Sequence, residues 1–437
     1  MTSSFELSRR ALIKGAAATS AALGAGAVFA PAVHAATTIK LGYVSPRTGP
    51  LAAFGEPDDF IIKSFLEAVK GGVKLGGKSV VIEVVAKDSQ SNPNRAAEVA
   101  KELIVSDEVA MMLVASTPET TNPVSTQCEI EGVPCISSVA PWQPYFIGRQ
   151  ANPGAPPTWK PFENTFHFFW GLEDIIAVYT NMWGQLTTNK MVGGLFPNDG
   201  DGNAWGDKVV GFPPVLEKLG YKLTDPGRFQ DLTDDFSAQI AAFRSSGADI
   251  ITGVVIPPDF TTFWNQANQK GFRPKAASIG KAILFPSAVE ALGKSGNNLS
   301  SEVWWSPWHP FKSSLTGISA GDLAKAYSQS TGKQWTQQIG FAHALFEVAI
   351  DSLKRSADSG DSKANVAAIG ATDLDTIVGK IKFGSEALPP FARKNIAKTP
   401  LVGGQWRLRD AGKYDIVIVD NQTAPIIPAA GKMEPIA

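Results

Sequence analysis

The chain has 437 residues with a formal net charge of -1, and 44% of its residues are hydrophobic. Its lysines and arginines are scattered rather than clustered, which argues against the basic surface that nucleic-acid partners require. A charged content of 19% is typical of a well-packed globular protein. A chain of this length is comfortable for two domains.

Residues 1–35 have the pattern of an export signal. Arg9 and Arg10 precede an apolar stretch of small side chains over 16–32, and a small-residue cleavage pattern follows at 33–35. A membrane span needs about 20 strongly apolar residues, so we expect a signal peptide rather than an anchor. Adjacent arginines ahead of a hydrophobic pair favour the twin-arginine type over an ordinary secretion signal. The mature chain is thus predicted to be a soluble periplasmic protein.

The sequence contains two cysteines, Cys128 and Cys135. An oxidising compartment allows them to pair, and a helix that ends near Gly132 before a strand could bring their Cβ atoms together. We predict a disulfide here, with two free buried thiols as the alternative. No metal site is expected, because the histidines of the mature chain are not at ligand spacing to these cysteines.

Hydrophobic spacing predicts alternating strands and helices from residue 37 onward. Residues 37–45 are rich in β-branched side chains and predict a strand, and apolar residues at helical spacing predict a helix over 59–69. The alternation continues with a strand over 79–85, a helix over 94–106, a strand over 110–115, a helix over 122–130 and a strand over 133–137. A passage rich in proline and aromatic residues, 141–169, interrupts it.

The same rhythm restarts after residue 169. Helices are predicted over 175–186, 208–219, 236–245, 261–269 and 341–357. Strands are predicted over 191–196, 250–255, 277–279 and 414–420, and at the start of the segment 301–311. Such alternation predicts an α/β fold in which helices cover both faces of parallel sheets. We expect two doubly wound lobes joined by a hinge of several crossings: 36–169 plus 308–399 as lobe 1, and 170–307 plus 400–430 as lobe 2.

The loops that follow the strands are the candidate binding site, because ligands of open parallel sheets lie at the carboxyl ends of the strands. One such loop, Ser116-Thr117-Pro118-Glu119, combines a helix-capping pattern with proline at a first helical position. Its hydroxyl and N–H groups could bind a carboxylate. The alternative is that a hydroxyl here only caps its own helix.

Four blocks of sequence resemble one protein family in their order and spacing. They are IKLGYVSPRTGPLAAFG, AKDSQSNPNRAAEVAKELI, EIEGVPCISSVAP and AWG. They are similar to blocks of periplasmic substrate-binding proteins of ABC transporters, of the branched-chain amino-acid (Leu/Ile/Val-binding) type, from about residue 39 to residue 420. The resemblance implies a type I fold with three hinge crossings that closes on a small ligand and delivers it to membrane ABC permease subunits. We expect a monomer without a nucleic-acid partner.

The resemblance also implies which residues contact the ligand. It places the hydroxyl that binds a ligand carboxylate at Ser116, with Ala115 and Thr117 beside it. Backbone contacts fall near Val139 and Ala140.

Three positions of the second lobe depart from the family pattern. Trp205 stands where a tyrosine is usual, and Ile256 stands where an aromatic residue is expected. Lys281 aligns near the acidic residue that holds an α-ammonium group in amino-acid-binding members. A like charge there would cost several kcal/mol when desolvated. We therefore predict a ligand that combines a carboxylate with an apolar or aromatic portion, with an amino-acid-like compound as the alternative.

Further candidate ligand contacts are Arg47, Phe54, Trp170 and Trp308. Each has a structural alternative: Arg47 could pair with an acidic residue of its own loop, and Trp308 could pack between the lobes. Lys281 could simply be solvated.

No pattern in the sequence points to an enzyme. The chain lacks a G-x-S-x-G motif, and GDGNAWG has neither the spacing of a phosphate loop nor the lysine that follows one. We predict no catalytic residue, no cofactor and no metal. Binding without chemistry is the favoured function; a periplasmic ligand-sensing subunit of a signalling receptor and an exported hydrolase are the alternatives.

Overall fold

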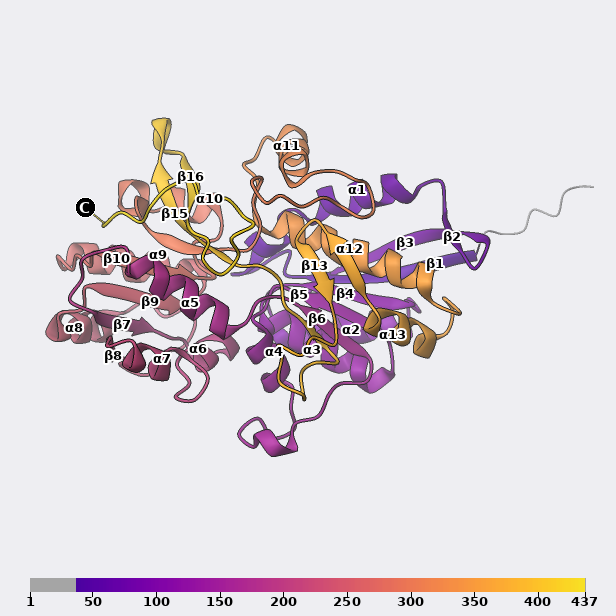
Figure 1. The fold of residues 1–437 in the computed structure, drawn as a ribbon, viewed down its shortest axis with the longest axis horizontal. Helices are drawn as coiled ribbons and strands as arrows, with labels where there is room; N and C mark the ends of the chain where they lie inside the picture. The colour runs from indigo at the N-terminus through magenta and orange to yellow at the C-terminus, as the bar shows by residue number, and fades with distance from the viewer. Residues whose placement is uncertain (1–36, 437) are drawn as a thin grey trace, which may run out of the picture. The chain divides into compact units, whose positions relative to one another are not determined.

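Two seven-stranded sheets organise residues 37–436, the part of the chain that the computed structural model describes (Figure 1). The signal peptide predicted over 1–35 lies outside these residues. None of the described helices is both long enough and apolar enough to cross a bilayer.

The first sheet has the strand order β14-β6-β5-β4-β1-β3-β2. Its strands are β1 (Thr37–Ser45), β2 (Val73–Leu75), β3 (Lys78–Asp88), β4 (Met111–Ala115), β5 (Cys135–Ser138), β6 (Thr165–Phe168) and β14 (Ile396–Ala397). All neighbours are parallel except β2 and β3, which form a hairpin. Gly76 and Gly77 connect these two strands with φ values of 53° and 81°, the positive values that a tight two-residue turn requires.

Helices cover both faces of the first sheet. They are α1 (Asp58–Val69), α2 (Pro93–Val105), α3 (Pro118–Glu131), α4 (Trp142–Gly148), α11 (Ala320–Thr331), α12 (Gln338–Arg355) and α13 (Ser362–Gly370). A separate two-stranded hairpin, β12 (Asp373–Thr376) and β13 (Gly379–Lys382), follows α13 in the chain. Alternate residues of β4 explain the two faces. Met111 and Leu113 pack in the same core as α1 and α12, whereas Met112 and Val114 pack with α2 and α3.

The second sheet has the order β16-β15-β11-β10-β9-β7-β8. Its strands are β7 (Met191–Leu195), β8 (Lys222–Thr224), β9 (Ile250–Val254), β10 (Ala276–Gly280), β11 (Ser300–Val303), β15 (Val402–Leu408) and β16 (Tyr414–Asp420). The strands from β7 to β11 are parallel, and β15 is antiparallel to both of its neighbours. The helices of this part are α5 (Leu172–Trp183), α6 (Gly200–Trp205), α7 (Phe212–Lys218), α8 (Ser237–Ser246), α9 (Pro257–Gln269) and α10 (Pro286–Glu290).

The chain passes between the sheets three times within the described residues. It leaves the first sheet after β6, leaves the second after β11, and returns to the second after β14. The predicted α/β class with parallel sheets is confirmed.

The structure does not contain the predicted disulfide and matches the alternative of two free buried thiols. Cys128 and Cys135 are free thiols, and both are buried against the face of the first sheet that α2 and α3 cover. The sulfur of Cys135 lies 3.6 Å from the Ser125 hydroxyl, so this thiol has a hydrogen-bonding partner in the core. Burial raises the pKa of the Cys128 thiol well above its usual value, which keeps it protonated.

Candidate ligand-binding site

A small cavity of about 30 Å³ lies where the loops after the strands of the two sheets meet. The first sheet and the segment that leaves it contribute Phe54, Thr117, Val139, Pro141, Phe169 and Trp170. The second sheet and its loops contribute Asp201, Trp205, Val254, Lys281, Leu284, Glu302 and Trp304. This position follows the general rule that ligands of parallel sheets bind at the carboxyl ends of the strands.

Three tryptophans of the cavity have indole N–H groups without a hydrogen-bond partner among the described residues. They are Trp170, Trp205 and Trp304, and each side chain is buried. Phe169 packs on two of them, with ring centroids 4.8 Å from Trp170 and 5.4 Å from Trp304. An unpaired buried donor is costly, so these three N–H groups are available to acceptor atoms of a bound molecule.

Thr117 is the residue before α3, but its side chain does not cap this helix. The backbone carbonyl of Thr117 accepts from Thr120 and Thr121 instead, each at 3.0 Å. The Thr117 hydroxyl therefore does not cap α3, which was the alternative role expected from the sequence. The residue lines the cavity.

Two residues of the cavity have a left-handed backbone. Val139 follows β5 with a φ of 69°, and Lys281 follows β10 with a φ of 64°. This conformation is costly for a residue with a side chain, most of all for β-branched valine. Strain of this kind concentrates at binding sites, and here it falls on the two loops that face each other across the cavity.

Lys281 is buried with three carboxylates around its ammonium group. The Nζ atom lies 2.8 Å from Asp199 and 2.8 Å from Asp201, and 3.6 Å from Glu119. Its hydrogen-bond acceptor among them is Asp199, and Glu119 at 3.6 Å is an ion-pair contact too long for a hydrogen bond. Lys281 is therefore neither solvated nor free to neutralise a ligand carboxylate, which removes the charge conflict expected from the sequence.

The charges of this cluster are unequal, because three carboxylates face one cation. Burial opposes the charge of Lys281, but Asp199, Asp201 and Glu119 raise its pKa well above the usual value. Burial raises the pKa of Asp201 to about 7, Lys281 lowers it, and the neighbouring carboxylates raise it further. Asp201 also keeps one carboxylate oxygen without a partner in the described structure.

The same carboxylates are the one group with metal-binding geometry among the described residues. Ligand atoms of Glu119, Asp199 and Asp201 lie within 4.8 Å of one another. The ammonium of Lys281 contacts all three and takes the place that an ion would need.

Glu302 is a second acidic group of the cavity, and its position is fixed. Its Oε2 accepts hydrogen bonds from the Tyr179 hydroxyl at 2.7 Å and from the Ser301 hydroxyl at 2.8 Å. The backbone N–H of Lys281 donates to Oε1 at 3.4 Å. Burial raises the pKa of Glu302, and these donors act in the opposite direction.

Several predicted contacts lie outside the cavity lining. Arg47 forms an ion pair with Asp59, a residue of its own neighbourhood. The Trp308 side chain is 48% exposed and packs edge-on against Trp335, with ring centroids 5.8 Å apart. Ile256 is buried at the start of α9.

The remaining predicted residues lie at or just after the ends of β4 and β5, next to lining residues in sequence, without lining the cavity themselves. The carbonyl of Ala115 accepts from Gln338 at 3.0 Å, and the carbonyl of Ala140 pairs with the ring of His167 at 2.8 Å. Ser116 is buried, and its hydroxyl has no partner in the described residues. The predicted residues that the cavity does bring together are Phe54, Thr117, Val139, Trp170, Trp205 and Lys281.

Sequence reasoning missed Asp201, Glu302, Phe169 and Trp304. Glu302 carried a usable signal, since a lone acidic residue in a strand pattern such as SSEVWW requires buried partners. Phe169 lies in the passage that the pattern treats as irregular. Asp201 lies in GDGNAWG, which resembles a loop in sequence but forms α6.

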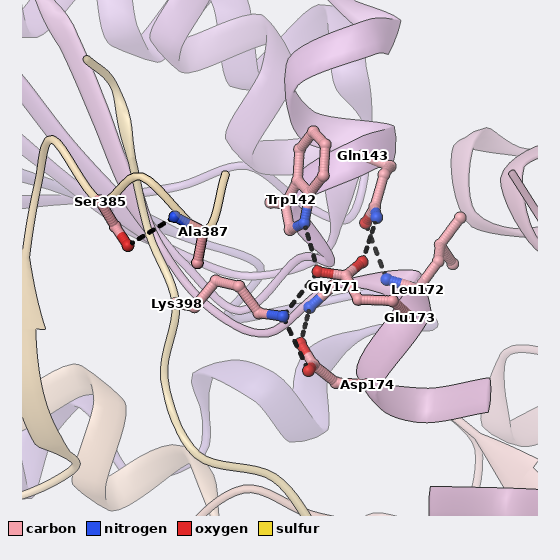
Figure 2. Close-up of polar contacts among 9 residues, drawn as sticks. All are labelled: Trp142, Gln143, Gly171, Leu172, Glu173, Asp174, Ser385, Ala387 and Lys398. Carbon is pink, nitrogen blue, oxygen red and sulfur yellow. Dashed lines mark hydrogen bonds and ion pairs between the residues drawn. The ribbon is translucent and has the colours of Figure 1, made fainter. Parts of the chain in front are cut away.

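Ion pairs join two of the crossing segments near the cavity (Figure 2). Lys398 follows β14, and its Nζ lies 2.6 Å from Glu173 and 2.8 Å from Asp174 in the first turn of α5. The indole N–H of Trp142 donates to Glu173 at 3.2 Å. At Gly171 a Cβ would lie 2.3 Å from the same indole nitrogen, so only glycine allows this close approach.

The fold and the cavity together define a solute-binding class of protein, and the comparisons agree. The chain matches the family described as periplasmic binding protein over residues 38–395. A Leu/Ile/Val-binding protein homologue of Brucella abortus is 23% identical over 408 residues, which covers 88% of this chain and 93% of the relative.

Two solved structures share the fold. A leucine-binding protein of Thermotoga maritima has a TM-score of 0.69 at 18% identity, covering 88% of this chain and 99% of its own. A solute-binding protein of Rhodopseudomonas palustris, solved with 4-hydroxybenzoate, has a TM-score of 0.67 at 16% identity, covering 91% of this chain and 98% of its own.

The chain belongs to the periplasmic binding protein family. The resemblance and the fold class predicted from the sequence are thereby confirmed. Members of this family bind solutes without catalysing a reaction, so the prediction that the protein is not an enzyme is confirmed as well.

Proposed function

We propose that this protein is an extracytoplasmic solute-binding protein that captures a small ligand between two lobes and delivers it to an ABC permease. Lobe 1 comprises 36–169 plus 308–399, and lobe 2 comprises 170–307 plus 400–430. The membership of the strands supports this division, because β14 joins the first sheet and β15 joins the second. Crossing segments near 170, 307 and 400 act as the hinge.

The observation that carries the proposal is the aromatic cavity with three unpaired indole donors. Donors in an apolar surround select a ligand that has oxygen acceptors and an apolar or aromatic body. The relatives are consistent with this class: one is a leucine-binding protein, and another was solved with 4-hydroxybenzoate. A carboxylate with an apolar or aromatic portion is therefore the proposed ligand.

An amino-acid-like ligand remains within the proposed class, and the carboxylate cluster supports it. Lys281 is saturated by acidic partners, so it does not repel an amine. The free oxygen of Asp201 lies in the lining and is an acceptor for an amine or hydroxyl donor. From the sequence alone, the charge of Lys281 favours carboxylates that lack an amine. This argument no longer holds, because the charge of Lys281 is neutralised by its acidic partners.

Matched pairs of compounds test the proposal by thermal shift. We would compare leucine with 4-methylpentanoate, phenylalanine with 3-phenylpropanoate, and 4-hydroxybenzoate with phenol. A ligand that binds only the folded state raises the melting temperature as its concentration increases. At 100 times its Kd it adds about 2.7 kcal/mol to the free energy of unfolding. We expect at least one carboxylate to do so, and phenol, which lacks the carboxylate of 4-hydroxybenzoate, to fail. The two amino-acid pairs differ in the α-amine and show whether the site accepts it.

The variant Trp304→Phe tests the indole donors directly. It keeps an aromatic ring in the cavity and removes one N–H donor, so we expect the affinity for the active carboxylate to fall about fivefold to tenfold, as for one lost hydrogen bond. Trp308→Phe is the matched control, since Trp308 lies outside the lining. Isothermal titration calorimetry measures both. Equal losses for the two variants, or no response to any carboxylate, would contradict the proposal.

A further inference from the structure

One ion pair connects the two proposed lobes away from the crossing segments. Glu119 lies in the first turn of α3, beside the first sheet, and Lys281 follows β10 of the second sheet. The other ion pairs of residues 37–436 join groups of the same proposed lobe, involve Lys398 at the third crossing, or, for Arg407–Glu434, join lobe 2 to the C-terminal segment that follows it.

The partners of Lys281 differ in where they come from. Asp199 and Asp201 lie at the start of α6, on the same side of the cleft as Lys281, and would keep their contacts if the lobes parted. Glu119 alone comes from the opposite side. The Lys281 ammonium therefore has its third carboxylate neighbour, at 3.6 Å, only while the two sides are together.

The backbones next to this ion pair are also in close contact. A Cβ built on Gly200 would lie 3.2 Å from the Cβ of Pro118, so the first turn of α3 and the first turn of α6 approach closely at this point. Burial works against the charge of Glu119, but Lys281 and nearby hydrogen-bond donors together outweigh it and hold the pKa of this carboxyl below its usual value. The charged form of Glu119 is thus the one that the closed arrangement stabilises.

We propose that Glu119 and Lys281 form a latch that holds the closed form of the protein, and that Lys281 stabilises closure instead of binding the ligand. Glu119 is a positioning residue, because it does not line the cavity. The latch must be weak, since Asp199 and Asp201 repel Glu119 while Lys281 attracts it. A weak latch lets the ligand-free protein reopen. This inference rests on the proposed two-lobed function and goes beyond it, because it does not depend on which ligand is bound.

The test compares Glu119→Gln with Glu131→Gln in the ligand-free protein. Both substitutions remove one carboxylate from α3, but Glu131 contacts only Gln127 of its own helix. Small-angle X-ray scattering should give a larger radius of gyration for E119Q than for the wild type, because the population shifts towards the open form. E131Q should scatter like the wild type.

Hydrogen exchange of the same variants separates opening from loss of fold. In E119Q we expect faster exchange in the segments 116–121 and 199–206, which face each other across the cleft, and unchanged protection in β4 and β9. Scattering and exchange identical to those of E131Q would overturn the latch. Faster exchange spread equally over β4 and β9 would overturn it too, because Glu119 would then serve the fold and not closure.

Discussion

At the scale of single residues, Lys281 shows that the place of a residue in the sequence does not by itself reveal its role in a binding site. In sequence it is a cation at the end of a strand, which is the usual signature of an anion site. In the structure its ammonium is surrounded by acidic groups from two distant segments. The separation of these segments along the chain is the reason that the sequence could not reveal them.

Gly340 is a residue where helix propensity and packing oppose each other. It lies in α12, where alanine is ordinarily better by up to about 1 kcal/mol. A Cβ at this position would lie 2.3 Å from the indole ring of Trp305. We expect Gly340→Ala to lower the free energy of unfolding by about 1–3 kcal/mol, measured by urea denaturation.

Gly370→Ala provides the control for this helix-glycine substitution. Gly370 ends α13, and a Cβ there would meet Phe166 at an ordinary 3.5 Å. We expect an effect within about 1 kcal/mol of zero. A G340A protein as stable as G370A would show that Trp305 moves aside without cost.

His343 makes the stability depend on pH. Burial lowers its pKa to about 4, from an ordinary value of 6.5, and its Nε2 pairs with the Ser313 hydroxyl at 2.8 Å. Between pH 6.5 and pH 4, His343 binds a proton in the unfolded chain but stays neutral in the folded protein. The contribution of the neutral histidine to the free energy of unfolding is therefore present above pH 6.5 and is lost as the pH falls towards 4.

The comparison of His343→Gln with the wild type isolates this effect. The difference in unfolding free energy between the two proteins should fall by up to about 3 kcal/mol between pH 7 and pH 4, because one pKa unit corresponds to about 1.4 kcal/mol. Chemical denaturation at several pH values measures it. Parallel curves for the two proteins would rule out a neutral buried histidine at this position.

At the scale of elements, segments with runs of β-branched residues were predictable, and two segments that contain glycine, β15 and α6, were not. β1 and β16 have the bounds expected from their β-branched runs. β15 was missed because VGGQWRL carries two glycines, which are needed where its backbone passes close to Met182 and Val303. α6 was missed because Asp-Gly-Asp-Gly-Asn has poor helix propensity, and Asp199 compensates by accepting from the N–H of Gly202.

The ion pairs between crossing segments give the prediction for this scale. Lys398→Met leaves Glu173 and Asp174 next to each other without their cation. We expect a lower melting temperature than for Lys394→Met, whose lysine pairs only with the exposed Glu163. Differential scanning calorimetry compares the two. Equal melting temperatures would mean that the crossing segments do not depend on Lys398.

At the scale of the whole molecule, the architecture was predictable and the site only partly so. Alternating strands and helices indicate two doubly wound sheets, and the loops after the strands indicate where a ligand lies. Trp205 and Thr117 follow from that logic and line the cavity. Trp308 does not, because side-chain direction after a proline-rich turn depends on packing with Trp335, which is distant in sequence.

The edge strand β14 has a consequence for how the chain is made. Its two residues pair with His167 and Phe168 of β6, and Asn395 beside it binds the carbonyls of Phe162 and Thr165. Until the ribosome has synthesised that late segment, β6 presents a bare edge to which other chains can add. The first sheet therefore cannot be completed before residue 397 has been synthesised, so its last strand is added by contacts between segments far apart in the chain.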